Sequence, residues 1–219
     1  MAPSRSALVT GGSTGLGLAT AHTLVRPGLG VTVTGRTPET LEAAVEELRS
    51  SGADARGVVA EHVAHHHGLD VAVANAGFTA PGDLADGDPD LWRSMVLTNV
   101  LGPALLVKAA LPHLTAPGGQ VVLVGSVAGR IIRPGSLYGA TKAAVAAIAQ
   151  NLRPQLTDSG IRVALVEPGI TDTPFWGDAG APPFALEAEA VAEAVGYIVS
   201  QPIGVDVNEV MVRPVGQPI

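Results

Sequence analysis

The stretch Leu8–Thr20, LVTGGSTGLGLAT, joins a short β-branched run to the start of an Ala/Leu-rich helix. It holds the glycines Gly11, Gly12, Gly15 and Gly17. Glycines at such a turn let the backbone bend sharply, approach a pyrophosphate and pack the helix close to the sheet. The helix that follows offers free N–H groups and the positive end of its dipole to an anion. The stretch predicts a phosphate-binding strand–turn–helix unit, although taken alone it leaves open an ordinary glycine-rich turn.

Outward from this stretch, short apolar runs alternate with segments of helical spacing. The runs are near-continuously apolar, as strands covered on both faces must be. The expected strands are Ser6–Thr10, Val31–Gly35, Asp70–Asn75, Gln120–Gly125, Arg162–Glu167 and Glu209–Arg213. The expected helices begin near Gly15 and at Pro38, and run through Asp90–Lys108, Leu137–Leu156 and Leu186–Ser200. Such alternation predicts an α/β fold, a three-layer doubly wound parallel sheet of the Rossmann type, in a single domain over residues 1–219.

Composition narrows the class of protein. A chain of 219 residues, 47% of them hydrophobic, can bury a sizeable core in one domain. A net charge of −7 argues against a nucleic-acid surface, which needs clustered Lys and Arg. Without cysteine there is no disulfide, thiolate metal site or cysteine nucleophile. We see no signal-peptide pattern and no run near the roughly 18 uncharged apolar residues of a membrane span, so we expect a soluble cytoplasmic protein without a membrane partner.

The end of the second expected strand bears on cofactor choice. In doubly wound sheets an acid at this place binds the adenosine ribose 2′-OH, whereas an Arg accommodates a 2′-phosphate. Here the sequence is VTVTGRT, without an acid and with Arg36 after Gly35. A guanidinium can hold a phosphate through two N–H groups. The sequence therefore favours NADP(H) over NAD(H), with a solvated surface role for Arg36 as the alternative.

Tyr138 and Lys142 lie four residues apart in an apolar segment, LYGATKAAV, and so share one helix face. An ammonium near a phenol favours the phenolate, so we expect Lys142 to lower the pKa of Tyr138 and to suit it for proton transfer. Ser126 follows the expected strand Gln120–Gly125, where its hydroxyl can bond a substrate oxygen as charge develops. The alternatives are a half-buried core tyrosine with a snorkelling lysine, and a plain turn serine.

Five motifs occur in an order that resembles the short-chain dehydrogenase/reductase family. They are TGGSTGLG (Thr10–Gly17), ANAG (Ala74–Gly77), Ser126 after its strand, YGATK (Tyr138–Lys142) and EPG (Glu167–Gly169). Each is weak alone, but together they are specific, and the similarity runs from Ser6 to about Gln217. The resemblance implies a single Rossmann-type domain that transfers hydride between a nicotinamide and a carbonyl or alcohol.

The same resemblance implies roles for individual residues. Ser126, Tyr138 and Lys142 would be catalytic, and Asn99, in LTNVLG, would complete the set by holding a water against Lys142. Asn75 would stabilise the central sheet as much as it lines the cofactor site. The expected cofactor-binding residues are Gly11, Ser13, Thr14, Gly15, Leu16, Gly17, Arg36, Asn75, Ala76, Gly77, Tyr138, Lys142, Pro168, Gly169, Ile170 and Thr173.

The chain departs from the family pattern in two places. Between Arg36 and Asn75 the segment is short, so the third strand, possible over Ala55–Ala60, and the helix after it would be clipped or displaced, and an Asp-Val element that contacts adenine is missing. Ser126 and Tyr138 are twelve residues apart, one fewer than the family leads us to expect. The intervening loop could absorb the difference, and Ser136 is a less convincing replacement.

Further features bear on function and partners. The segment Asp172–Phe184 contains Phe175, Trp176 and Phe184 and suggests an apolar lid over the substrate or a subunit contact. The histidines His62, His65, His66 and His67 lack accompanying carboxylate or Cys ligands, so no metal site is expected.

We expect an NADP-dependent carbonyl reductase or alcohol dehydrogenase acting on a small molecule, as a homodimer or homotetramer. The alternative is a related scaffold that binds dinucleotide but turns over little.

Overall fold

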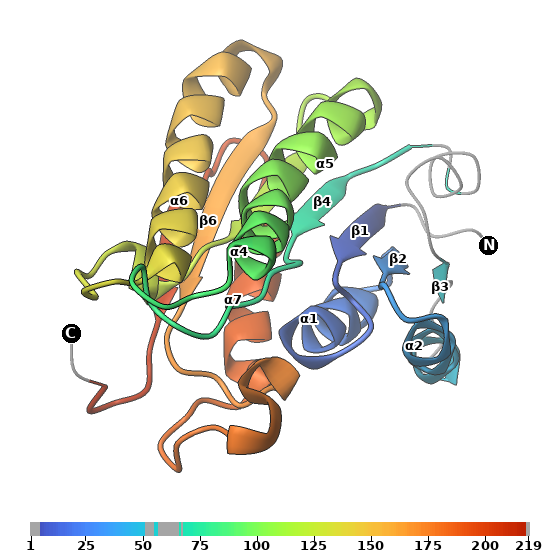
Figure 1. Ribbon diagram of the computed structural model, residues 1–219. Coiled ribbons are helices and arrows are strands. Elements are labelled where there is room, and N and C mark those ends of the chain that lie inside the picture. The colour runs from blue at the N-terminus through green and yellow to red at the C-terminus, as the bar shows by residue number, and fades with distance from the viewer. Residues whose placement is uncertain (1–4, 51–54, 57–65, 67, 218–219) are drawn as a thin grey trace.

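The computed structural model describes residues 5–50, 55–56, 66 and 68–217. One sheet of parallel strands runs in the order β3-β2-β1-β4-β5-β6-β7 (Figure 1). The strands are β1 (Ser6–Thr10), β2 (Gly30–Thr34), β3 (Ala55–Arg56), β4 (Val71–Ala74), β5 (Gln120–Val124), β6 (Arg162–Pro168) and β7 (Glu209–Val212). The α-helices are α1 (Gly15–Val25), α2 (Pro38–Ser50), α4 (Pro89–Val96), α5 (Gly102–Ala110), α6 (Leu137–Leu156) and α7 (Ala188–Ser200). The predicted doubly wound, Rossmann-type architecture is confirmed.

The strand order reverses at β1, which lies between β2 and β4. Leu8 pairs with Thr32 of β2 on one side and with Ala72 of β4 on the other. In an open parallel sheet, ligands bind beyond the carboxyl ends of the strands at such a reversal. The turn after β1 is therefore at the place where a ligand would meet the sheet.

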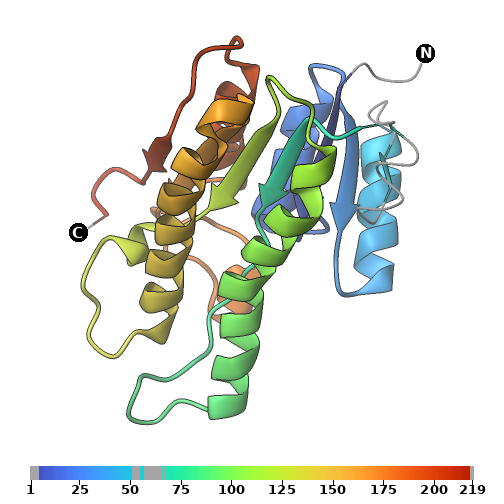
Figure 2. The ribbon, with the colours of Figure 1, turned by 90° about the horizontal axis from the view of Figure 1, so that it is seen from above.

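Alternate residues of the strands enter two separate cores, because successive side chains of a strand point to opposite faces. Ala7 and Val9 belong to a core shared with α1, α2 and α7. Leu8 belongs to a second core shared with α5 and α6. Figures 1 and 2 show these two groups of helices on opposite faces of the sheet, which gives the three expected layers.

The helix expected over Asp90–Lys108 is interrupted. Between α4 and α5 the chain makes a π-helical turn, Leu97–Leu101. Pro103 has no N–H, so it cannot donate the α-helical hydrogen bond to the carbonyl of Asn99. Single π-helical turns of this kind are frequent at functional sites. The turn directs the Asn99 side chain into the protein, where Asn99 is 1% exposed.

The shortened region before β4 is described only in part. β3 has two residues, and they pair with Val31 and Thr32 of β2. The possible strand extended to Ala60 in our prediction, and its later residues lie outside the described part of the chain. The same holds for the clipped helix expected after it.

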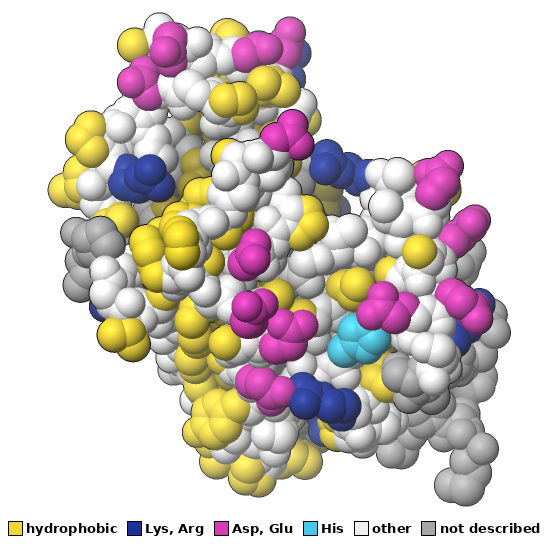
Figure 3. Space-filling model, turned by 90° about the horizontal axis from the view of Figure 1, so that it is seen from below, with side chains coloured by type: hydrophobic (Ala, Val, Ile, Leu, Met, Phe, Trp, Pro, Cys, Tyr) yellow, Lys and Arg dark blue, Asp and Glu magenta, His cyan; other side chains and the backbone are white. Residues whose placement is uncertain are grey.

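Within the described residues, one helical run, 89–113, is long and apolar enough to cross a membrane, judged by length and composition only. Core helices of globular proteins pass the same test. Leu106, Val107 and Ala110 of this run are buried against the sheet, so the run is part of the fold. On the face of the molecule seen in Figure 3, Asp and Glu side chains are spread widely and Lys and Arg lie at separate positions.

Candidate active site

The glycine-rich turn after β1 brings three backbone segments too close for side chains. A Cβ on Gly17 would lie 2.5 Å from Nδ2 of Asn75 and well inside van der Waals contact of the Gly11 carbonyl oxygen. Gly11 and Gly15 have φ values of +64° and +52°, which favour glycine. Thr14 precedes α1 in an extended conformation, and its side chain does not cap the helix. The first amides of α1, at Gly15, Leu16 and Gly17, therefore face the turn without a side-chain acceptor.

The residues after β2 lie beside this turn. A Cβ on Gly35 would sit 2.6 Å from Oγ of Ser13, so the two segments touch. Arg36 is exposed, and its guanidinium carbon lies 5.8 Å from the centroid of the Phe78 ring. The Arg36 cation is thus held over an aromatic face that follows β4.

Asn75 joins the ends of β1 and β4. Its Nδ2 donates to the carbonyls of Thr10, at 3.0 Å, and Gly11, at 3.2 Å. The backbone amides of Asn75 and Ala76 donate to Oγ1 of Thr10, at 3.1 and 3.3 Å. These bonds give Asn75 a structural position at the mouth of the turn. Thr10, which our sequence reasoning did not single out, is its partner.

Tyr138 and Lys142 lie on the first turns of α6. Ser136 caps this helix by accepting from the amide of Gly139 at 3.1 Å. The Ser126 side chain interacts with the Tyr138 hydroxyl and by itself lowers its pKa. Lys142 is 5% exposed, and its Nζ donates to the carbonyl of Val124 at 2.9 Å and lies 5.8 Å from the centroid of the Tyr138 ring.

The pKa values differ from our expectation that Lys142 lowers the pKa of Tyr138. Burial raises the pKa of Tyr138 to about 12, against the opposing effects of the hydrogen bond with Ser126 and the charge of Arg133. Burial also lowers the pKa of Lys142 to about 8. Both groups are disfavoured in their charged forms, because each is removed from water. The ammonium is directed to the Val124 carbonyl, and desolvation outweighs its effect on the phenol.

Despite the shorter spacing along the chain, Ser126 is the serine whose side chain affects the pKa of Tyr138. Ser126 Oγ accepts from the amide of Ala128 at 3.1 Å and lies 3.5 Å from the Pro168 carbonyl, to which it can donate. Ser136 caps α6 instead. The geometry thus favours Ser126 over Ser136 as the partner of Tyr138.

Asn99 connects the π-helical turn to the site. Its side chain donates to the Phe78 carbonyl at 2.8 Å and accepts from the Phe78 amide at 3.0 Å. It also donates to Oγ1 of Thr141 at 3.1 Å, and that hydroxyl donates to the Tyr138 carbonyl at 2.7 Å. A Cβ on Gly77 would lie 3.2 Å from Asn99 Oδ1 and 3.4 Å from Lys142 Nζ. Asn99, Gly77 and Lys142 therefore meet at one place.

The segment after β6 faces the glycine turn. The amide of Gly169 donates to the Val212 carbonyl at 2.7 Å, and that of Ile170 donates to Oε1 of Gln217 at 2.9 Å. A Cβ on Gly15 would lie 3.1 Å from Cβ of Thr173, so this segment reaches the start of α1. Sequence reasoning missed Gln217, because nothing near the end of the chain marks which loop its side chain contacts.

Aromatic residues of the predicted lid lie against the site. The rings of Phe175 and Tyr138 are 5.6 Å apart between centroids, and those of Phe175 and Trp176 are 5.9 Å apart. Trp176 Nε1 donates to the Thr171 carbonyl at 2.8 Å. Phe175 is 39% exposed, which leaves an apolar surface next to Tyr138.

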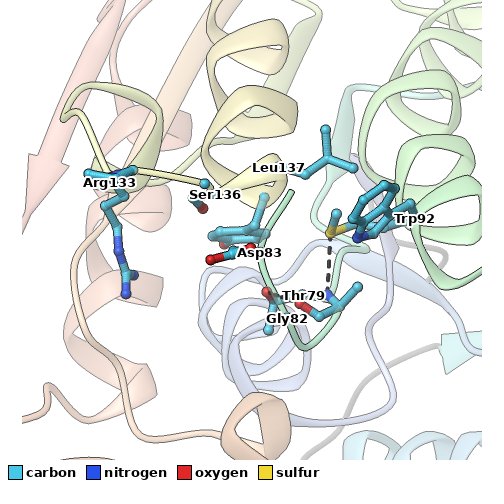
Figure 4. Close-up of a pocket in the computed structure, with 12 residues that line it drawn as sticks. Thr79, Gly82, Asp83, Trp92, Arg133, Ser136 and Leu137 are labelled. Atoms are coloured by element: carbon cyan, nitrogen blue, oxygen red, sulfur yellow. Dashed lines mark hydrogen bonds between the residues drawn. The ribbon is translucent and has the colours of Figure 1, made fainter. Parts of the chain in front are cut away.

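Tyr138 also lines a cavity of about 240 Å³ (Figure 4). Its walls come from the segment after β4, from α4, and from the loop and first turn of α6. The lining residues are Thr79, Ala80, Gly82, Asp83, Trp92, Met95, Arg133, Pro134, Gly135, Ser136, Leu137 and Tyr138. The amide of Ala80 lies 3.3 Å from the sulfur of Met95, the contact drawn as a dashed line in Figure 4. The cavity can admit a small molecule beside the phenol.

Among the described residues, no three His, Asp or Glu side chains are grouped to hold a metal ion. His62, His65 and His67 lie outside these residues, so most of the histidine cluster is not described.

The reversed sheet, the glycine turn and the Ser126–Tyr138–Lys142 cluster at its carboxyl edge define a Rossmann-type oxidoreductase. Comparison with known proteins agrees with this class. The family model described as short chain dehydrogenase matches residues 5–182. The chain belongs to the short-chain dehydrogenase/reductase family.

Individual relatives are similar over almost their whole length. An uncharacterized oxidoreductase of Staphylococcus saprophyticus is 33% identical, covering 95% of this chain and 97% of the relative. The structure of an alcohol dehydrogenase from Thermococcus sibiricus complexed with 5-hydroxy-NADP superposes with a TM-score of 0.91, at 27% identity and 98% coverage of both chains. A Burkholderia cenocepacia short chain dehydrogenase in complex with NADP gives a TM-score of 0.87 at 29% identity and 97% coverage of both chains.

Proposed function

We propose that this oxidoreductase is an NADP(H)-dependent carbonyl reductase or alcohol dehydrogenase in which Tyr138 exchanges the proton. The observation that carries the proposal is the placement of Tyr138 beside the buried Lys142, whose Nζ lies 5.8 Å from the centroid of the phenol ring. A bound nicotinamide supplies the hydride in reduction and accepts it in oxidation. The residues of this chain would bind the dinucleotide, transfer the proton and stabilise the charge on the substrate oxygen.

The glycine turn fits a dinucleotide. Side chains at Gly11, Gly15 or Gly17 would meet neighbouring backbone or side-chain atoms, so the turn leaves the backbone bare for a pyrophosphate. The first amides of α1 would donate to its oxygens, aided by the helix dipole. Thr14 and Ser13 flank this position, and Thr173 faces it from the segment after β6. Ala76 and Gly77 would line the adenosine side, and Pro168 and Ile170 the nicotinamide side.

Arg36 would select NADP(H). It follows β2 without a neighbouring acid, and its guanidinium is held near the Phe78 ring, 5.8 Å from the centroid. Arg36 and the Ser13 hydroxyl would together bind the ribose 2′-phosphate. The NADP complexes of related structures from Thermococcus sibiricus, as 5-hydroxy-NADP, and Burkholderia cenocepacia support this choice.

The protonation states of the free protein suit carbonyl reduction. With a pKa of about 12, the Tyr138 phenol holds its proton at neutral pH and can donate it to the substrate oxygen. The Ser126 hydroxyl would donate to the same oxygen as negative charge develops. With a pKa of about 8, Lys142 carries its charge at neutral pH and stabilises that oxygen while bonding the nicotinamide ribose. Asn99 would order a water beside Lys142. In alcohol oxidation the proton moves to Tyr138 instead.

The cavity beside Tyr138 would receive the substrate. Trp92, Met95 and Leu137 contribute apolar atoms to its lining, whereas Asp83, Arg133 and Ser136 contribute polar ones. The Phe175 ring lies 5.6 Å from that of Tyr138 between centroids. The aromatic ring beside Tyr138 would contact an apolar or aromatic group of a small carbonyl compound, and the polar side chains of the cavity would bond its other groups.

The protein would act as a homodimer or homotetramer. Leu97, Leu101 and Leu105 are 50%, 45% and 55% exposed, and they recur at four-residue spacing along one helical surface. A contiguous apolar stripe of this kind marks an association surface. A second copy of the chain would cover it.

The test is NADPH oxidation with a panel of ketones and aldehydes, run on the wild type, Tyr138→Phe and Tyr197→Phe. Loss of the phenolic proton should lower kcat/KM by about 10²- to 10⁴-fold. NADPH affinity should change by only about threefold, which corresponds to about 0.7 kcal/mol of binding free energy. Tyr197 is the chain's other tyrosine, 58% exposed on α7, and its substitution should leave activity unchanged.

Two results would refute this function. One is a Tyr138→Phe variant that retains most of its activity. The other is a wild type that binds NADPH but reduces none of the panel, which would favour a dinucleotide-binding module with little turnover.

A further inference from the structure

Arg130 lies at the end of the single turn that begins at Ser126. Ser126 caps this 3₁₀ turn, Val127–Gly129, by accepting from the amide of Ala128 at 3.1 Å. The amide of Gly129 donates to the Ser126 carbonyl at 2.9 Å, and that of Arg130 donates to the Val127 carbonyl at 2.9 Å. Only three residues lie between Ser126 and Arg130, so whatever holds Arg130 also holds the turn that presents the serine.

Two glutamates on neighbouring strands bind Arg130. Its Nε lies 2.5 Å from Oε1 of Glu167 on β6, and its Nη2 lies 2.6 Å from Oε2 of Glu209 on β7. A planar guanidinium can serve two carboxylates in this way, whereas the single ammonium of a lysine cannot reproduce the fork. Glu209 also accepts from Arg153 of α6, the helix that carries Tyr138, at 3.4 Å. We call the group Arg130, Glu167 and Glu209 the Arg130 bridge.

The Glu167 side chain is only 3% exposed. A buried carboxylate is stable only when it is paired and hydrogen-bonded. Among the residues that the structure describes, Arg130 is the only cation in an ion pair with Glu167. The hydrogen bond that Arg130 donates to Glu167 accordingly raises the pKa of Arg130, against burial, which lowers it.

Glu167 lies close to the segment that carries Ser126. It directly precedes Pro168, whose carbonyl lies 3.5 Å from Ser126 Oγ. Its Cγ would lie 3.4 Å from a Cβ on Gly125, the residue before Ser126, and the amide of Gly125 donates to the Val166 carbonyl at 2.7 Å. Glu167 therefore binds the turn after Ser126 through Arg130 and packs against the residue before it.

We propose that Arg130 is a positioning residue of the active site, which acts through the buried Glu167 to hold the Ser126 hydroxyl towards Tyr138. The inference rests on the proposed function of Ser126 and extends it to a residue that touches neither substrate nor cofactor. If Arg130 had a purely structural role, its substitution would lower the stability of the protein. Its effect on kcat would then not depend on the presence of the Ser126 hydroxyl.

A measurement on the protein without cofactor tests the anchor directly. Amide hydrogen exchange of Ala128 and Gly129 should be about tenfold faster in Arg130→Gln, because their acceptors belong to a turn that is no longer held. Arg130→Lys should be intermediate. Arg26→Gln is the matched control, since Arg26 forms an exposed ion pair with Glu193 between α1 and α7, and it should leave these amides unchanged.

The second measurement uses kinetics in two backgrounds. Arg130→Gln should lower kcat for ketone reduction about tenfold with NADPH affinity within about threefold, as expected when a reacting group is misplaced. In a Ser126→Ala background the same substitution should lower kcat less than about twofold, because effects that act through one group are not additive. If Arg130→Gln does not fold, the double variant Arg130→Gln/Glu167→Gln is used in its place. The double variant removes the buried carboxylate together with the guanidinium, so that no buried charge is left unpaired.

Two outcomes would overturn the inference: unchanged exchange at Ala128 and Gly129, or an equal loss of kcat with and without the Ser126 hydroxyl. A wild type without any turnover would refute the proposed function, and the exchange measurement would still decide whether Arg130 holds the turn.

Discussion

At the scale of single residues, the most informative feature is the opposite effect of burial on Tyr138 and Lys142. Burial raises the pKa of Tyr138 to about 12 and lowers that of Lys142 to about 8. The two changes leave a neutral phenol and a charged ammonium together at neutral pH, which is the combination that carbonyl reduction needs.

The pH dependence follows from these values. Since the pKa of Lys142 is about 8, its ammonium is present below that pH and lost above it, while Tyr138 keeps its proton up to about 12. We expect kcat/KM for ketone reduction to be flat near neutral pH and to fall as the pH rises through about 8. Alcohol oxidation, which needs a phenolate, should become faster with rising pH.

Initial rates from pH 6 to 10 in both directions measure these profiles. In Lys142→Arg the guanidinium stays charged, so the fall near pH 8 should disappear from whatever activity remains. A fall at the same pH in that variant would assign it to another group.

Arg36 allows a test of cofactor choice. Arg36→Glu removes the guanidinium and places a carboxylate where the 2′-phosphate would bind, so the two negative charges repel. We expect NADPH affinity to fall by about 10²-fold or more, equal to ~2.7 kcal/mol, and NADH to become the preferred cofactor. Titration of both dinucleotides by fluorescence measures the change, with NADH as the internal control. Unchanged NADPH affinity would show that Arg36 is a surface residue without a role in binding.

At the scale of elements, the turn between β1 and α1 depends on the absence of side chains. A Cβ on Gly17 would lie 2.5 Å from Asn75 Nδ2 and against the Gly11 carbonyl, where neither neighbour is free to withdraw. We expect Gly17→Ala to weaken NADPH binding about tenfold or more and to destabilise the protein by about 1–3 kcal/mol.

Gly68→Ala is the control for this substitution, because the nearest atom to its Cβ would be Thr115 Oγ1 at 3.8 Å. Calorimetric unfolding and NADPH titration of both variants provide the measurement. Equal behaviour of the two variants would contradict the close approach at Gly17.

The π-helical turn shows how an element can be re-shaped for one side chain. Leu97–Leu101 lies between two α-helices, and the missing N–H of Pro103 removes the bond that an α-helix would make to the Asn99 carbonyl. The Asn99 side chain bonds both polar groups of the Phe78 backbone. Spacing alone predicted a continuous helix here and did not reveal the π-helical turn.

At the scale of the whole molecule, the leucine stripe of α4 to α5 predicts self-association. Leu101→Glu/Leu105→Glu places two charges on this stripe, and burying them against a second copy would be unfavourable. We expect the wild type to elute as a dimer or tetramer and the variant as a monomer. Ile203→Glu is the control, because Ile203 is 75% exposed on a loop away from the stripe. Light scattering after gel filtration measures the mass, and a monomeric wild type would contradict the proposal.

Much of the fold could be predicted from the local pattern of apolar residues along the chain. Runs such as VVLV are apolar at every position, and a strand of that kind is stable only between two helical layers, so the parallel sheet followed from the order of the runs. The glycine turn, Arg36 after β2 and the Tyr138–Lys142 pair were recognisable because their chemistry depends on short spacings along the chain.

Contacts between distant segments could not be read in this way. Glu167 and Arg130 are 37 positions apart in the chain, and no pattern in either segment shows that the carboxylate is buried and paired with that guanidinium. The same applies to Gln217, which binds the Ile170 amide, and to the Lys142 ammonium, which is directed to the Val124 carbonyl. Local spacing decides secondary structure and the order of layers, since these depend on near neighbours. Protonation states and the support behind Ser126 depend on burial and on partners that meet only after the strands have assembled, and for that reason they belong to the folded protein alone.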